Sequence, residues 1–220
     1  MASTRPVPER ALIIDLGSLV GVTDPLGALR ELADAAEDSA FDALWVGGEE
    51  VAGHLERTTV LGAQARMTTT LQLGAAPSGA ERRPPSILAK IVAGLDVISH
   101  GRALVGLRLV DPDDTVEVER LVEACTVVRR VLDGDDPTFD GTFYRVDGAV
   151  NQPGPVRAGG VPVVVFVAGG LGAPGSDAVT RLAPVVDAVV DDAPGGTPGV
   201  VRLDGVPTAD AVRALSPPTA

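Results

Sequence analysis

Short apolar runs alternate with segments of helical periodicity along nearly the whole chain, and this alternation constrains the fold most strongly. Apolar runs rich in Val, Ile and Leu predict buried strands, whereas apolar residues spaced at a period near 3.6 predict amphipathic helices. A repeated strand–helix pattern is typical of a parallel sheet, either doubly wound or closed into a barrel. We expect strands at 11–16, 41–46, 69–75, 103–110, 161–168, 187–190 and 200–203, helices at 25–39, 55–66, 86–99, 115–132, 176–186 and 208–215, and a hairpin at 138–146.

The chain is expected to form a single domain. Its 220 residues suit one domain of ordinary to large size, and no boundary resembles an interdomain linker. We therefore interpret residues 1–220 as one domain, with residues 1–10 and 216–220 as flexible ends. Aromatic residues make up only 3%, so the core must be built from Val, Leu, Ile and Ala.

Charge and cysteine content exclude several classes of function. The formal net charge of −12 argues against nucleic acid as a partner, because phosphate binding needs a basic face. The single Cys125 cannot form an intramolecular disulfide, and we interpret it as a small buried apolar residue in a reducing compartment. No stretch approaches the roughly 18 consecutive apolar residues that a membrane helix needs. We expect a soluble, cytoplasmic protein with no membrane partner and no metal site.

Residues 87–102, ILAKIVAGLDVISHGR, resemble a helix-to-strand segment of the luciferase-like monooxygenase superfamily that typically runs LAK-x-AATLDVLSGGR. Other segments resemble the family in the same order, at 31–50, 54–75 and 120–146, the last together with 162–170. The resemblance implies a (β/α)8, TIM-barrel-like α/β fold that binds flavin mononucleotide (FMN) or the deazaflavin coenzyme F-420. It also implies two-electron redox chemistry: oxygenation in the flavin branch and hydride transfer in the F-420 branch.

The resemblance places the cofactor at the carboxyl ends of the strands, where barrels of this kind hold their sites. Glycine is useful there because a flat ring can approach the backbone closely. A glycine-rich turn after the fifth strand could hold the cofactor phosphate, although an ordinary tight turn explains it equally well. The expected cofactor-binding residues are Gly48, Gly74, Ala75, Ala76, Gly106, Arg108, Gly169, Gly170 and Gly172.

Two departures from the family pattern affect the chemistry. Glu49 and Glu50 stand where F-420-dependent relatives often carry Asp-His. We expect Glu49, Glu50 or His54 to handle the proton as catalytic residues, with ordinary exposed side chains as the alternative. Arg108 stands at a glycine position, where its side chain either fills the space of the cofactor ring or pairs with an anionic group of the cofactor.

Three polar residues of the 87–102 segment are interpreted as structural. His100 follows the predicted helix at the end opposite the strand carboxyl ends, so we expect a solvated side chain. Asp96 and Arg102 are expected to form a structural ion pair, away from the chemistry.

The chain is shorter than the family pattern, and the join after the sixth strand leaves no room for another helix and strand. We therefore expect an incomplete barrel of about seven strands.

The leading hypothesis is an oxidoreductase that uses F-420 or FMN for hydride transfer on a small organic substrate. F-420 is preferred because LDVISHGR resembles that branch and the composition looks actinobacterial. The alternative is a degenerate, non-catalytic barrel that acts as a partner or regulatory subunit. A homodimer is expected in either case, because a truncated barrel must cover its open side.

Overall fold

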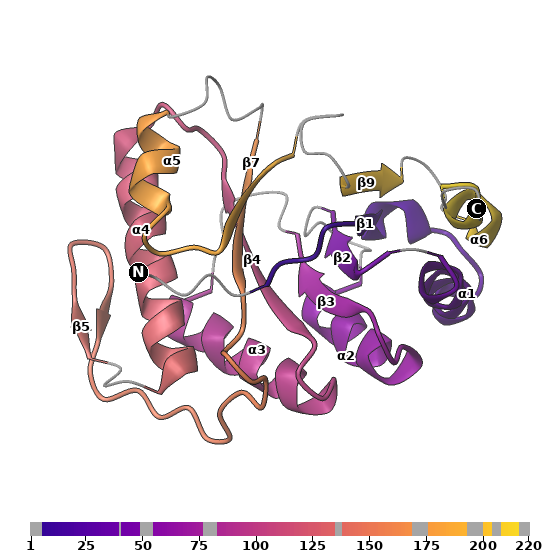
Figure 1. The fold of residues 1–220 in the computed structure, drawn as a ribbon, viewed down its shortest axis with the longest axis horizontal. Coiled ribbons are helices and arrows are strands. Elements are labelled where there is room, and N and C mark those ends of the chain that lie inside the picture. Colours follow the sequence, from indigo (N-terminus) through magenta and orange to yellow (C-terminus); the bar gives the residue numbers. More distant parts are fainter. Residues whose placement is uncertain are drawn as a thin grey trace.

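The fold is a curled parallel sheet with helices packed on its outer side (Figure 1). The computed structural model describes residues 6–39, 41–48, 55–76, 83–134, 138–168, 176–192, 200–203 and 208–215. Seven strands lie in the order β8-β7-β4-β3-β2-β1-β9, and neighbouring strands pair in parallel. The chain therefore has the α/β, TIM-barrel-like architecture expected from the strand–helix alternation.

Every predicted strand and helix is present, with bounds that differ by a few residues. The sheet contains β1 (Ala11–Asp15), β2 (Ala43–Gly47), β3 (Gln72–Ala75), β4 (Ala103–Leu109), β7 (Val163–Val167), β8 (Ala188–Asp191) and β9 (Val200–Leu203). A short antiparallel hairpin joins β5 (Phe139–Asp140) to β6 (Arg145–Val146). The helices are the 3-10 helix η1 (Leu16–Leu19) and α1 (Pro25–Glu37), α2 (Arg57–Met67), α3 (Pro85–Ile98), α4 (Thr115–Asp133), α5 (Asp177–Leu182) and α6 (Ala209–Ala214).

Local signals in the sequence set the helix ends. The Asp24 carboxylate accepts a hydrogen bond from the backbone N–H of Gly27 at 2.8 Å, and Pro25 occupies the first helical position of α1. Helix α4 begins after Asp114, whose side chain caps the first turn, and ends at Gly134 in the left-handed conformation with φ 74°. Both ends follow from residues that satisfy unpaired backbone groups or tolerate positive φ.

The two faces of the sheet have different partners. Side chains alternate along a strand, so residues such as Leu12, Leu44 and Val105 point outward and join the core under the helices. A second cluster, which includes Ile13 and Trp45, lies on the inner side of the curl. Cys125 of α4 is fully buried in the outer core, and burial raises the pKa of its thiol to about 12, which confirms its interpretation as a packing residue.

The curled sheet is open in the described part of the chain. β9 pairs with β1, and β8 pairs with β7, so β8 and β9 are the two edges among the described strands. The last helix, α6, packs beside α1 at the same end of the sheet (Figure 1). The described strands thus confirm the prediction of an incomplete, TIM-barrel-like sheet of about seven strands. In the described part of the chain, no helix is long and apolar enough to cross a membrane.

Asp96 fastens the amino-terminal end of the sheet. Its side chain is fully buried, and its carboxylate accepts hydrogen bonds from the backbone N–H groups of Ala103 at 3.2 Å, Val156 at 2.7 Å and Arg157 at 2.8 Å. These contacts join the end of α3 to the start of β4 and to the segment before β7. His100, just beyond α3, is exposed as predicted, with φ 57°.

The predicted ion pair between Asp96 and Arg102 is wrong. Arg102 instead donates to backbone carbonyl oxygens, among them those of Leu71 at 2.6 Å and Ala65 at 3.0 Å. The reason is that both side chains lie where helices and strands end, and the unpaired backbone groups there compete for them. Burial lowers the pKa of the Arg102 guanidinium, and the negative charge of Glu37 partly offsets this decrease. The hydrogen bonds to carbonyl groups satisfy the N–H donors of Arg102.

Candidate cofactor site at the strand ends

The parallel strands bring several of the predicted cofactor-binding residues to one edge of the sheet. Gly48, Ala75, Ala76 and Arg108 lie at or just beyond the carboxyl ends of β2, β3 and β4. The backbone N–H of Ala76 still donates to Val46 at 2.9 Å, so the end of β3 is held against β2. This edge is where barrels of this architecture position their functional groups.

Gly74 and Gly106 lie one layer further in, where the indole of Trp45 occupies the space beside them. A Cβ on Gly74 would lie 2.3 Å from Cζ3 of Trp45, and one on Gly106 would lie 2.9 Å from the same atom. Phe166 of β7 packs edge-on against Trp45, with ring centroids 4.9 Å apart. The inner side of the sheet therefore has an apolar floor below the strand ends. Contact of these two glycines with a cofactor ring stays a prediction.

The turn after β2 is held by a buried cation. Arg57, the first residue of α2, is only 7% exposed, and its Nη1 donates to the carbonyl oxygen of Gly48 at 2.8 Å. Gly48 has φ 102°, and a Cβ there would lie 2.4 Å from Oδ1 of Asp15. Only glycine suits that position, because the backbone conformation and the neighbouring carboxylate both exclude a side chain.

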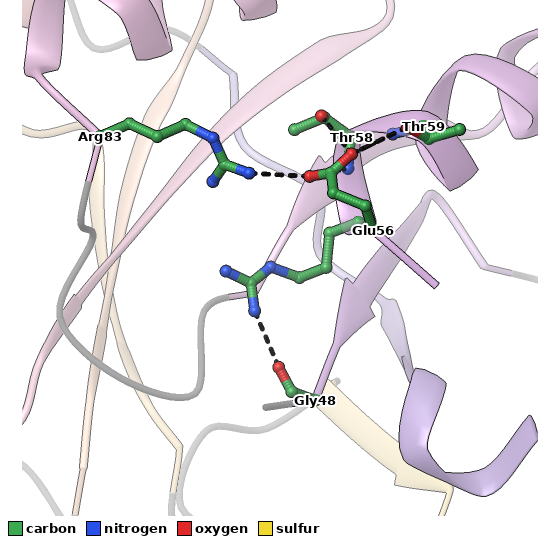
Figure 2. A network of polar contacts seen from close by, with 6 residues as sticks. Gly48, Glu56, Thr58, Thr59 and Arg83 are labelled. Atoms are coloured by element: carbon green, nitrogen blue, oxygen red, sulfur yellow. Dashed lines mark hydrogen bonds and ion pairs between the residues drawn. The ribbon is translucent and has the colours of Figure 1, made fainter. Parts of the chain in front are cut away.

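A second cation reaches the same region through Glu56 (Figure 2). The Glu56 carboxylate caps α2 by accepting from the backbone N–H groups of Thr58 at 3.0 Å and Thr59 at 2.7 Å, and Nη2 of Arg83 donates to it at 2.8 Å. Burial raises the pKa of Glu56, but the hydrogen bonds from both threonines outweigh burial and bring the pKa to about 2. The carboxylate is therefore ionised at neutral pH, and it holds the Arg83 guanidinium at the start of α2.

Arg108 forms an ion pair with Asp192, the residue that follows β8. Their side chains are 15% and 5% exposed, so the pair is largely withdrawn from solvent. Arg108 is the register partner of Phe166, and Asp192 comes after the strand on the far side of β7. The pair therefore ties β4 to the edge strand across the top of the apolar floor. Whether the side chain meets a cofactor ring or an anionic group of the cofactor stays a prediction.

Six of the predicted residues lie outside the described part of the chain. They are the proposed proton-handling residues Glu49, Glu50 and His54 and the glycines of the proposed phosphate turn, Gly169, Gly170 and Gly172. Their roles stay predictions. Within the residues that the structure describes, no three His, Cys, Asp or Glu side chains are grouped to hold a metal ion.

Sequence reasoning missed four residues of this edge: Glu56, Arg57, Arg83 and Asp192. Glu56 caps α2 although glutamate is not among the residue types preferred at a helix N-cap, so no standard capping signal pointed to it. Nothing in the sequence indicates that Arg83 and Asp192 reach residues 27 and 84 positions away, respectively.

The donors at this edge fit a cofactor with an anionic group. Arg57 lies beside the turn after β2, Arg108 lies at the carboxyl end of β4, and Arg83 is paired with Glu56 at the start of α2. A guanidinium presents several N–H donors in a planar arrangement that suits phosphate and carboxylate. Arg83 and Arg108 are each paired with a carboxylate, so an anionic group of a cofactor would compete with Glu56 and Asp192 for them.

The curled parallel sheet and its strand-end site define a TIM-barrel-like α/β protein. More particularly, the chain belongs to the luciferase-like monooxygenase family, whose family model matches residues 11–184. That match includes the strands from β1 to β7 and the residues described at the edge, apart from Asp192.

Curated relatives of this chain include two kinds of reductase or dehydrogenase. It is 25% identical over 145 residues to a 5,10-methylenetetrahydromethanopterin reductase of Archaeoglobus fulgidus, covering 61% of this chain and 41% of the relative. It is 29% identical over 173 residues to an F420-dependent glucose-6-phosphate dehydrogenase of Nakamurella multipartita, covering 70% of this chain and 48% of the relative. The chain thus spans about half the length of the curated relatives it matches.

A solved structure confirms the fold. The coenzyme F420-dependent tetrahydromethanopterin reductase from Methanopyrus kandleri superposes with a TM-score of 0.65 at 18% identity, over 83% of this chain and 55% of that one. The monooxygenase RslO1 from Streptomyces bottropensis gives a TM-score of 0.56 at 24% identity, over 72% of this chain and 54% of that one.

Proposed function

We propose that this chain is a luciferase-like oxidoreductase that uses coenzyme F-420, or else FMN, for hydride transfer on a small organic substrate. The family supports the class of reaction, and the printed names of the relatives, an F420-dependent dehydrogenase among them, favour F-420. The observation that supports cofactor binding most directly is the position of Arg108 on the inner side of the sheet near the carboxyl end of β4, where barrels of this architecture hold their sites.

Each described residue of the site has a part in this proposal. Arg108 binds the anionic portion of the cofactor, because it lies on the inner side of the sheet near the carboxyl end of β4, and Arg83 is a second candidate for the same role. Arg57 keeps the Gly48 turn in its conformation. Trp45 and Phe166 exclude water from below, which strengthens electrostatic contacts above them. Hydride exchange at the ring is the chemistry that F-420 or FMN supplies when bound.

Proton handling is assigned to Glu49, Glu50 or His54, all three from the segment between β2 and α2. This segment follows β2, whose carboxyl end lies at the same edge of the sheet as Ala76 and Arg108. A carboxylate or an imidazole near neutral pH suits acid–base work beside a redox cofactor.

The first experiment is a titration of the purified chain with F-420 and, separately, with FMN, followed by cofactor fluorescence and calorimetry. We expect micromolar binding of one of them, and at least tenfold weaker binding by Arg108→Gln. Arg213→Gln, which removes an exposed guanidinium of α6, is the matched control and should bind as the unaltered chain does. Absence of binding for both cofactors in a folded sample would overturn the proposal.

A non-catalytic partner or regulatory subunit is the second candidate. It is favoured by the Trp45 and Phe166 side chains inside the curl and by the Arg108–Asp192 pair above them. It predicts a folded protein that binds neither cofactor. For both candidates we propose a cytoplasmic homodimer, because the sheet has two strand edges in its described part and strand edges favour association. Sedimentation velocity over a hundredfold concentration range tests the dimer.

A further inference from the structure

A cleft between α2 and α3 passes through the helix layer and reaches the sheet. Its outer walls come from residues of the two helices, and its floor is formed by Ala75, Leu104 and Gly106 of β3 and β4. Its volume is about 250 Å³. Strands β3 and β4 pair at only two positions, Leu73 with Ala103 and Gly74 with Leu104, and the cleft reaches the sheet at Leu104 and just beyond this paired part, at Ala75 and Gly106.

The lining of the cleft is aliphatic and uncharged in the part of the chain that the structure describes. Leu61, Ile91, Leu95 and Ile98 are among the residues that line it. A ligand that carried charge would lose its hydration there without gaining a counter-charge. The chemistry of the walls therefore favours a neutral, largely hydrocarbon ligand.

Two threonines supply the polar part of the lining. The hydroxyl groups of Thr58 and Thr59 donate to Oε2 of Glu56, at 2.7 Å and 2.9 Å. Each hydroxyl has one hydrogen and two lone pairs, so what these oxygens still offer a ligand is acceptor capacity. A ligand with an O–H donor matches this end of the cleft.

Two glycines keep the cleft open. Gly62 of α2 and Gly94 of α3 both line it, and a Cβ built on either would meet no heavy atom within 4 Å. Glycine inside a helix lowers helix stability relative to alanine, and no close packing requires it at these positions. Binding of a ligand in the space between the two helices would explain why both helices have glycine there.

We propose that this cleft binds a neutral aliphatic alcohol of about ten non-hydrogen atoms. The size follows by proportion, because a dry cavity of about 150 Å³ holds benzene with its six carbon atoms. The small-molecule occupant is favoured over a second copy of the chain because the floor of the cleft is the sheet, behind both helices, which the broad surface of another subunit does not reach. The proposal does not rest on the redox function.

Trp45 provides the readout. It is the single tryptophan of the chain, and its ring lies against Gly106, which forms part of the cleft floor. Titration of the full chain with 1-octanol, without any redox cofactor, should change the Trp45 fluorescence in a saturable way. Octanoate, with the same chain length and a negative charge, should bind at least tenfold more weakly.

Filling the cleft should abolish the effect. We expect Gly94→Leu, and independently Gly62→Leu, to weaken octanol binding at least tenfold, with folding checked by circular dichroism. Ala63→Leu is the matched control, since Ala63 is half-buried on α2 and does not line the cleft. A response that rises linearly without saturation, or equal binding of octanol and octanoate, would overturn the proposal whether or not the variants fold.

Sedimentation velocity tests whether a second copy of the chain, rather than a small molecule, occupies the cleft. If the unaltered chain is a dimer that Gly94→Leu dissociates, a second copy fills the cleft and the alcohol site is refuted. An unchanged oligomeric state together with lost octanol binding supports the proposal. Because the titration contains no redox cofactor, failure here leaves the proposed redox function intact.

Discussion

The indole of Trp45 lies against the α-carbon of Gly74, so that a Cβ on residue 74 would come within 2.3 Å of Cζ3. The neighbouring strand contributes Gly106, whose Cβ would lie 1.8 Å from the backbone carbonyl oxygen of Ala75. Two glycines on adjacent strands thus accept one large side chain on the inner side of the sheet. An added Cβ would collide with a side chain at residue 74 but with backbone at residue 106. Mutation of Trp45 should therefore affect the cost of alanine differently at the two positions.

Gly74→Ala is expected to destabilise the fold by about 1–3 kcal/mol, the usual cost of overpacking a core. Combining it with Trp45→Leu should make the added cost of the alanine much smaller, because the obstructing atoms belong to the replaced ring. Urea unfolding of the two single variants and the double variant gives the coupling free energy.

Gly106→Ala supplies the contrast. Its nearest obstacle is the Ala75 carbonyl, which Trp45→Leu does not remove, so no comparable relief is expected in that double variant. If Trp45→Leu reduced the destabilisation by alanine equally at residues 74 and 106, the backbone of β3 would have to move freely, contrary to the packing described here.

The Arg108–Asp192 pair should contribute more to stability than an exposed pair. We expect Asp192→Asn to lower the free energy of unfolding by about 1–3 kcal/mol. The side chains of Arg108 and Asp192 are only 15% and 5% exposed, so removing one charge leaves the other largely buried without its partner charge. Asp210→Asn in the exposed Arg213–Asp210 pair should cost less than about 0.5 kcal/mol. Thermal and urea unfolding of both variants test this, and similar losses would contradict it.

Glu37 should make the fold sensitive to acid. Burial raises the pKa of its carboxyl, but hydrogen bonds from the backbone and side chain of Thr70 and from the backbone of Thr69 and Leu71 bring it from 4.5 down to about 2. A pKa lower in the folded than in the unfolded state stabilises the fold above the unfolded value. This stabilisation is lost as the pH falls from 4.5 towards 2.

Glu37→Gln should accordingly flatten the decrease of unfolding free energy across that pH range. Glu31→Gln, on the exposed side of the same helix, is the matched control, and it should leave the slope close to that of the unaltered chain. Urea unfolding measured at several pH values between 2 and 6 tests this, and the same flattening in both variants would contradict the assignment.

His100 occupies a conformation that suits glycine. Its φ of 57° lies in the left-handed region, where a side chain is disfavoured by about 1–2 kcal/mol. We expect His100→Gly to raise the free energy of unfolding by up to about 1 kcal/mol, since the greater freedom of glycine in the unfolded chain offsets part of the relief. His100→Ala should bring no gain. Melting temperatures of the two variants decide the matter.

Much of the fold could be predicted from local sequence. The apolar run at 161–168 and the periodic apolar positions of 115–132 are strong signals because buried parallel strands and amphipathic helices need those patterns. The short join between β8 and β9 also predicted the incomplete barrel, since the join itself is too short to hold a further helix and strand. The Asp96–Arg102 pair failed because sequence does not reveal competition from backbone groups at the ends of elements.

The site was predictable only in outline. Parallel strands dictate that their carboxyl ends share one edge, so Gly48, Ala76 and Arg108 could be placed there before the structure was known. Arg83 and Asp192 could not, because each reaches its partner from a distant part of the chain.

The sequence by itself determined the order and type of the elements, the parallel sheet and the edge at which function is expected, because these follow from periodicity and chain direction. The tertiary structure alone decided that Trp45 fills the space beside Gly74 and Gly106, that Asp192 holds Arg108, and that a cleft lies between α2 and α3. Such contacts depend on how far side chains reach across neighbouring strands and helices, and neither spacing nor composition encodes those distances.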